Sequence, residues 1–209
     1  MFVQQMQVGQ MAVFAYLVGD SITGDALVID PADNVHDLIA LAAKNGLQIN
    51  YIVNTHGHVD HIGGNADMKK LTGAKIIVHQ DDAVMLTSTP QAMLRMFGAK
   101  QSPPPDLLVQ DGQIISVGNV ELKVIHTPGH SPGGICLYTP GYVFTGDTLF
   151  VEAVGRTDLP GGSWQTLYNA IQDRLFTLPD ETRVMPGHNY GRTPTSTIGH
   201  EKKYNPSIR

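Results

Sequence analysis

The stretch Thr-His-Gly-His-Val-Asp-His occupies residues 55–61, and only Asn54 separates it from the apolar run Tyr-Ile-Val at residues 51–53. Aromatic and β-branched residues favour a buried strand, and the nearby glycines argue against a helix that continues through the histidines. We therefore expect the histidines to lie where a strand runs out into a loop. Imidazole and carboxylate groups are common metal ligands, so this stretch predicts one half of a metal site.

The alternation within this stretch predicts two adjacent ion sites. In an extended segment residues i, i+2 and i+4 point to one side, so His56, His58 and Asp60 are expected to converge on one point. His61 is out of phase with them and is expected to face a neighbouring point. The alternative interpretation is a loop of exposed histidines that binds no metal.

Three later stretches repeat one pattern, in which an apolar run is followed by glycine and then by a residue that can bind a metal. They lead to His130, Asp147 and His188. An ion held by nitrogen and oxygen needs about four donors, more than the first cluster can give to two ions. Glycine allows the backbone to turn tightly and to approach an ion closely. Each of these residues alone would be a structural histidine or a turn aspartate, but with the first cluster they predict further ligands.

This set of residues resembles the motif set of the metallo-β-lactamase fold superfamily. The resemblance covers almost the whole chain, up to the loop Pro186-Gly187-His188. It implies an α/β (α+β) fold, a four-layer αβ/βα sandwich with a dinuclear site at one edge of the two sheets. We expect residues 1–209 to form a single domain of this type.

The resemblance also implies how the ligands are shared. The first ion would be held by His56, His58 and His130, the second by Asp60, His61 and His188, with Asp147 bridging the two. We expect two divalent ions and favour zinc. Iron and manganese are the alternatives, because nitrogen and oxygen donors suit all three metals.

The composition is that of an ordinary globular chain, with 42% hydrophobic and 16% charged residues. A net charge of −5 argues against nucleic acid as a partner. The amino terminus, residues 1–5, has neither a basic segment nor a long apolar one, so we expect no signal peptide and no membrane contact. The lone Cys136 is consistent with a reducing compartment, and we expect a cytoplasmic protein. The oligomeric state stays open.

Hydrophobic periodicity and turn residues predict the elements. In the first half we expect strands at 2–8, 12–18, 26–29, 49–53 and 75–78 and helices at 33–45 and 65–72. Between residues 81 and 97 we expect one or two short helices interrupted at Pro90, with methionines that make this segment a candidate border of the site. In the second half we expect strands at 113–117, 120–125, 135–138, 142–145 and 182–185 and a helix at 198–203. Ser163 is expected to cap a helix with Trp164, Leu167, Ile171 and Leu175 on one face.

The predicted ligands suggest hydrolysis. A water shared by two divalent ions is acidified from a pKa of about 16 toward about 7, which gives a bridging hydroxide at neutral pH. Asp60 or Asp147 would hold this hydroxide by accepting its hydrogen bond, and both are candidate catalytic residues. The sequence offers no further general acid beside the ligands. A thiolate leaves readily because the pKa of a thiol is about 8.5, so a thioester is the expected substrate.

A finer resemblance supports this expectation. The chain is similar to the glyoxalase II group and, in its last third, to the related persulfide dioxygenases, through residues 155–158, 186–190 and 196–201. This implies cleavage of a thioester such as S-lactoylglutathione. It also implies that Arg156 and Tyr190 contact a small glutathione-type thiol ligand.

Two alternatives remain. The persulfide dioxygenases would use a single Fe(II) held by His56, His130 and Asp147 to oxidise glutathione persulfide. A metal-binding domain without catalysis is the other.

Overall fold

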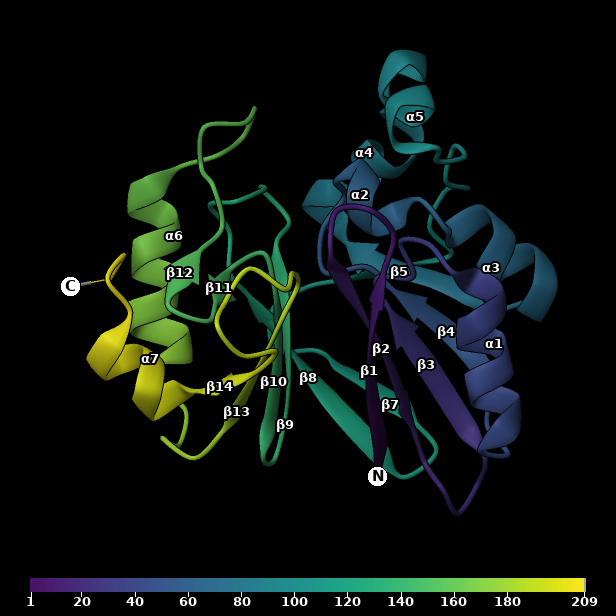
Figure 1. The fold of residues 1–209 in the computed structure, drawn as a ribbon, viewed down its shortest axis with the longest axis horizontal. Coiled ribbons are helices and arrows are strands. Elements are labelled where there is room, and N and C mark those ends of the chain that lie inside the picture. The colour runs from purple at the N-terminus through teal and green to yellow at the C-terminus, as the bar shows by residue number, and fades with distance from the viewer. Residues whose placement is uncertain (209) are drawn as a thin grey trace.

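The computed structural model describes residues 1–208 and shows two sheets packed face to face, with helices on both outer surfaces (Figure 1). The first half comprises β1 (Phe2–Val8), β2 (Val13–Gly19), β3 (Asp25–Ile29), α1 (Val35–Lys44), β4 (Gln48–Val53), α2 (Val59–Ile62), α3 (Asn65–Thr72), β5 (Lys75–His79), the 3-10 helix η1 (Gln80–Asp82), α4 (Ala83–Ser88), α5 (Gln91–Phe97) and β6 (Leu107–Val109).

The second half repeats the scheme of strands followed by helix. It comprises β7 (Ile114–Val117), β8 (Val120–His126), β9 (Ile135–Thr139), β10 (Tyr142–Gly146), β11 (Leu149–Phe150), β12 (Ala153–Val154), α6 (Trp164–Ala170), the π-helix η2 (Ile171–Leu175), β13 (Arg183–Pro186), β14 (Ser196–Thr197) and α7 (Ile198–Tyr204). The four-layer α/β sandwich expected from the sequence is confirmed.

Each large sheet is covered on both faces. Along β2, alternate residues belong to different cores: Leu17 packs under α1 and α3, whereas Tyr16 lies between the two sheets, edge-on to Phe144 of β10. A third core lies between the second sheet and α6, η2 and α7. Because both faces are buried, β2 and β3 are almost continuously apolar, as expected for covered sheets.

The strand directions place several loops at the same edge of the two sheets. The first sheet has the order β1-β2-β3-β4-β5-β6, and β3, β4, β5 and β6 are parallel neighbours. In the second sheet, β8 and β10 are both antiparallel to β9, and β13 is parallel to β10. Strands β8, β10 and β13 therefore share one direction, and the loops that follow them lie together.

Two local expectations need correction. Ser163 caps α6 as expected, its Oγ accepting a hydrogen bond from Thr166 N at 3.3 Å. Trp164, however, is 45% exposed and packs on Tyr168 of its own helix, so the buried face begins at Leu167. Strands β6, β11, β12 and β14 were not expected, because two or three residues are too few to show a period.

No helix within residues 1–208 has the length and apolar character that crossing a bilayer demands.

Asp20 links the two sheets at the edge opposite the collected loops. It accepts hydrogen bonds from Asn119 N and Ile22 N, both at 2.8 Å, and from Asn119 Nδ2 at 2.6 Å. These bonds, led by the one from Asn119 N, lower the pKa of Asp20 from 3.8 to about 2.

A folded-state pKa below the unfolded value means that the unfolded chain binds more protons, so this contribution to stability is present above about pH 4 and is lost as the pH falls toward 2. We expect Asp20→Asn to remove the part of the decrease in unfolding free energy at acid pH that arises from Asp20. Urea unfolding of chelator-treated protein between pH 4 and pH 2.5 measures this free energy. The exposed Asp173→Asn is the control, and an unchanged pH slope in Asp20→Asn would contradict the assignment.

Candidate metal centre

A first group of ligands joins the two halves of the molecule. His56 and His58 lie in the loop after β4, and His130 lies in the loop after β8. His130 Nε2 is 2.8 Å from His58 Nδ1 and 3.3 Å from His56 Nε2. Three imidazole nitrogens therefore point at one place, as the ligands of a single ion would.

The helical turn α2 changes the register expected from the sequence. The extended arrangement predicted for residues 56–60 is wrong from Val59 onward, because α2 begins there and each helical residue rotates the side chain by about 100°. Asp60 is thereby separated from the first group. It forms a second group with His61 and His188. His188 Nε2 lies 3.0 Å from His61 Nε2 and 3.5 Å from Asp60 Oδ2.

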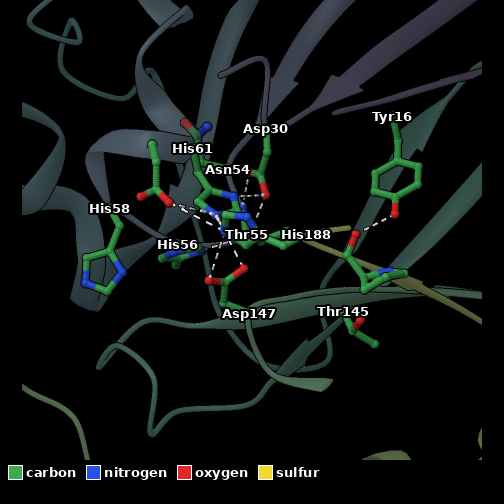
Figure 2. Close-up of polar contacts among 12 residues, drawn as sticks. Tyr16, Asp30, Asn54, Thr55, His56, His58, His61, Thr145, Asp147 and His188 are labelled. Atoms are coloured by element: carbon green, nitrogen blue, oxygen red, sulfur yellow. Dashed lines mark hydrogen bonds and ion pairs between the residues drawn. The ribbon is translucent and has the colours of Figure 1, made fainter. Parts of the chain in front are cut away.

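Asp147 lies between the two groups. Its Oδ1 is 3.3 Å from His61 Nε2, and its Oδ2 is 3.5 Å from His130 Nε2 and 3.4 Å from His188 Nε2. Figure 2 shows the Asp147 carboxylate facing the histidines from the side opposite Asp30. The structure thus brings all seven predicted ligands together in the grouping that the family resemblance implies.

Glycines allow the close approach of these loops. A Cβ on Gly187 would collide with Asp147 Oδ1. Gly146, directly before Asp147, has φ +46°, and a Cβ there would lie 2.5 Å from Thr55 Oγ1. The backbones that carry Asp147 and His188 therefore pass closer to the first cluster than residues with side chains would allow.

Asp30 was missed in the sequence. It follows β3, is 1% exposed, and accepts hydrogen bonds from Thr55 N at 2.8 Å and Thr55 Oγ1 at 2.6 Å. His61 Nδ1 is 3.0 Å from Asp30 Oδ2 (Figure 2). Donation from Nδ1 to this carboxylate leaves the Nε2 lone pair of His61 for an ion. The signal was available, since residues 26–29 form an apolar run that ends in a ligand-type residue.

The charges of the site favour a cation. Burial and the neighbouring His130 lower the pKa of His58 to about 4, and burial with the charge of His61 holds the pKa of His56 well below its usual value. Both imidazoles are therefore neutral at pH 7, with lone pairs free to bind metal. Burial alone would raise the pKa of Asp147, but the charge of His61 and the hydrogen bond from His188 keep it well below its ordinary value.

The residues fit a divalent metal. No hydrogen-bond donor within residues 1–208 satisfies Asp147 Oδ1, a buried carboxylate oxygen that needs a partner. Ring nitrogens of His56 and His58 lie 3.3 Å and 2.8 Å from His130 Nε2, so one cation placed among these three rings can accept a lone pair from each. All donors are nitrogen or oxygen, which suits zinc, iron and manganese.

A third group is less suited to metal binding. His79, Asp81 and His126 bring possible ligand atoms within 4.8 Å of one another. The two rings are stacked at 4.1 Å with an interplanar angle of 12°. Lone pairs of imidazole lie in the ring plane, so these nearly parallel rings do not direct them at one point.

The two predicted substrate contacts lie beside ligand residues. The Arg156 guanidinium is exposed and bonded to Asp158, with Nε–Oδ1 at 2.7 Å and Nη2–Oδ2 at 2.8 Å. The Arg156 carbonyl lies 2.8 Å from His130 Nδ1 and so orients that ligand. The Tyr190 ring stacks on His188 with centroids 4.5 Å apart and is 56% exposed.

A cavity of about 520 Å³ borders the second group at Asp60. Its walls are the β1–β2 turn, with Met11, and the end of α5, with Arg95, Met96 and Phe97. The methionine-rich segment therefore borders the site. This volume is within the range of small-molecule pockets.

We expect Asp147→Ala to reduce the zinc content from two ions per chain to one or fewer, because Asp147 lies between the two groups and its carboxylate is removed. Elemental analysis after equilibration with zinc and gel filtration measures this content. Asp173→Ala, which removes an exposed carboxylate remote from the site, should keep the full content. Retention of two tightly held ions by Asp147→Ala would refute the bridging role.

Comparison with known proteins identifies a family for the chain. The family "Metallo-beta-lactamase superfamily" matches residues 8–188. A protein of Aquifex aeolicus named only "Uncharacterized protein" is 37% identical over 99% of this chain and 96% of its own length. The mouse protein "Persulfide dioxygenase ETHE1, mitochondrial" is 32% identical over 98% of this chain and 75% of its own length.

Solved structures show the same fold. ETHE1 from Myxococcus xanthus superposes with a TM-score of 0.85 and 31% identity, over 99% of this chain and 84% of that one. TTHA1623 in a di-iron-bound form has a TM-score of 0.84 and 34% identity, and BLEG-1 B3 metallo-beta-lactamase has 0.89 and 30%, each over 99% of both chains. The chain therefore belongs to the metallo-beta-lactamase superfamily.

Proposed function

We propose that this metal-dependent enzyme is a persulfide dioxygenase that uses iron. The observation that carries the proposal is the similarity to ETHE1, at 32% identity over 98% of this chain for the mouse protein and 31% over 99% for the bacterial structure. The thioester hydrolysis expected from the sequence has no comparable support.

Two histidines of the first group, together with Asp147, supply a suitable iron site. His56, His130 and Asp147 provide two imidazoles and one carboxylate, a donor set used by non-haem Fe(II) oxygenases. A ferrous ion bound there would supply the activation of dioxygen. The chain's own part is to keep the His56 imidazole neutral by burial and to aim His130, whose Nδ1 is bonded to the Arg156 carbonyl.

The proposed reaction oxidises a persulfide, R–S–SH. With one O2 and one water it gives a thiol, R–SH, and sulfite, with release of two protons. The S–S bond breaks, the terminal sulfur is oxidised and dioxygen is reduced. No external reductant is needed, so the chain requires only a metal site and a place for the R group.

Arg156 and Tyr190 are proposed to hold the R group of a glutathione-type substrate. An exposed guanidinium beside the His130 loop can bind a substrate carboxylate if it leaves Asp158. Tyr190, stacked on His188, presents an apolar face and a hydroxyl beside the site. The cavity between Asp60 and α5 can take the remainder of the substrate.

Thioester hydrolysis is retained as a second candidate because of one specific observation. Asp60, His61 and His188 form a complete second group, with Asp147 within reach of both groups. A single-iron dioxygenase needs only His56, His130 and Asp147, whereas a binuclear hydrolase would use both groups and Asp147.

The decisive experiment compares three activities on one preparation whose metal content is known. After anaerobic loading with Fe(II), we expect oxygen uptake with glutathione persulfide and formation of one sulfite per O2. Zinc-loaded protein should consume no oxygen. Cleavage of S-lactoylglutathione without oxygen uptake would replace the proposal by the hydrolase, and efficient opening of a chromogenic cephalosporin would replace it by a β-lactamase.

We expect Arg156→Ala to raise KM for glutathione persulfide about tenfold, the loss of roughly 1.4 kcal/mol, with kcat nearly unchanged. The main-chain carbonyl that orients His130 is kept in this variant. Asp158→Ala frees the guanidinium and should lower KM or leave it unchanged. Steady-state oxygen uptake measures both variants, and an unaltered KM in Arg156→Ala would exclude the contact.

A further inference from the structure

Asp82 is a buried carboxylate that joins the two loops of the first metal group. It closes η1, the short helix after β5, and is fully buried. Its Oδ2 accepts hydrogen bonds from Gly57 N at 2.9 Å and from Ser131 Oγ at 2.7 Å. Its Oδ1 accepts one from Gly133 N at 2.6 Å. One side chain thus holds residues from both halves of the sandwich.

The bonded residues are neighbours of the ligands. Gly57 lies between His56 and His58, and Ser131 follows His130 directly. These three histidines come from loops on different sheets, and their nitrogens are 2.8–3.3 Å apart. Asp82 bonds to the loop that carries His56 and His58 and to the loop that carries His130, so it is an attractive link between these two loops.

The packing around Asp82 leaves the two ligand loops little room to move. A Cβ on Gly133 would lie 2.6 Å from Asp82 N, and one on Gly57 would lie 2.5 Å from Met85 Cβ, in the helix that follows. Glycine at both positions lets the loops close on η1 and α4. The distance between the loops is therefore set by direct contact with this segment.

The second group is held in a different way. Asp30 bonds to Thr55 and to His61 Nδ1. Asp30 therefore aims a ligand of the second group directly, while Asp82 acts on the first group through backbone amides and a hydroxyl. The two carboxylates follow β3 and β5, the strands on either side of β4 in the first sheet.

We propose that Asp82 is a positioning residue that sets the affinity of the His56–His58–His130 site for its metal, largely independently of the Asp60–His61–His188 site. In Asp82→Asn the amide keeps one acceptor oxygen and gains a donor. The NH2 group then faces either Gly133 N or Gly57 N, so one backbone amide loses its acceptor and one loop is released. Substitution of a residue that holds metal ligands through hydrogen bonds typically lowers metal affinity by about 10- to 100-fold.

The test is a zinc titration of metal-free protein against a competing chromophoric chelator, in which two sites give two steps. The titration is carried out in the His188→Ala background, which isolates the first group, and in the His130→Ala background, which isolates the second. We expect Asp82→Asn to weaken zinc binding at least tenfold in the former and less than threefold in the latter.

Asp81→Asn is the matched control, because it makes the same change of charge at the adjacent residue, whose side chain is 46% exposed. It should leave both affinities unchanged. Ser131→Ala removes a single bond to Asp82 and should weaken the first site in the same direction by a smaller factor, so the proposal stays testable if Asp82→Asn does not fold.

Thermal unfolding of the metal-free proteins distinguishes a role of Asp82 in positioning the first metal group from a role in stabilising the whole fold. A lower Tm for Asp82→Asn with unchanged zinc affinity at the first site would overturn the proposal. Equal weakening of both sites would also overturn it, because a disturbance of the whole fold would then explain the result. The readout is metal affinity, so the outcome does not depend on which reaction the enzyme catalyses.

Discussion

The convergence of buried imidazoles and carboxylates around Asp147 is the constraint on which the rest of this structure depends. Oxygen atoms of Asp147 lie 3.3–3.5 Å from ring nitrogens of His61, His130 and His188. A buried carboxylate oxygen that makes no hydrogen bond, as Asp147 Oδ1 within residues 1–208, is unfavourable without a cation. Metal binding and the correct meeting of the two sheets are therefore linked, as in other sites whose ligands come from distant parts of a chain.

The parallel strands explain how this convergence is reached. In the first sheet, Asp30, the histidine cluster and Asp82 follow β3, β4 and β5; in the second, His130, Asp147 and His188 follow β8, β10 and β13. Parallel strands end at the same edge, so each sheet delivers its polar loops to one place. The buried cores behind that edge are rigid, and they allow the loops to carry ligands at hydrogen-bonding distances.

The same ligand set can serve different reactions. Two imidazoles and a carboxylate suit iron and oxygen chemistry, while the two complete groups suit a binuclear hydrolase. Which of the two reactions is catalysed depends on which ion occupies each group and on which substrate the neighbouring cavity accepts. For this reason a good thiolate leaving group does not by itself identify a thioester substrate, because hydrolysis depends on which metal binds. The similarity to persulfide dioxygenases over nearly the whole chain favours oxidation.

The sequence alone determined the candidate ligands, because apolar runs that end in glycine and a metal-binding residue are local patterns, and through these residues the resemblance to the superfamily gave the fold. It did not determine that α2 begins at Val59, since a four-residue helix has no recognisable period, and this turn assigns Asp60 to His61 and His188. It also did not reveal the hydrogen-bond partners of Asp30 and Asp82, which lie 25 or more residues away. Hydrogen bonds between distant loops are a property of the packed sheets, so only the tertiary structure decided which carboxylates support which histidines.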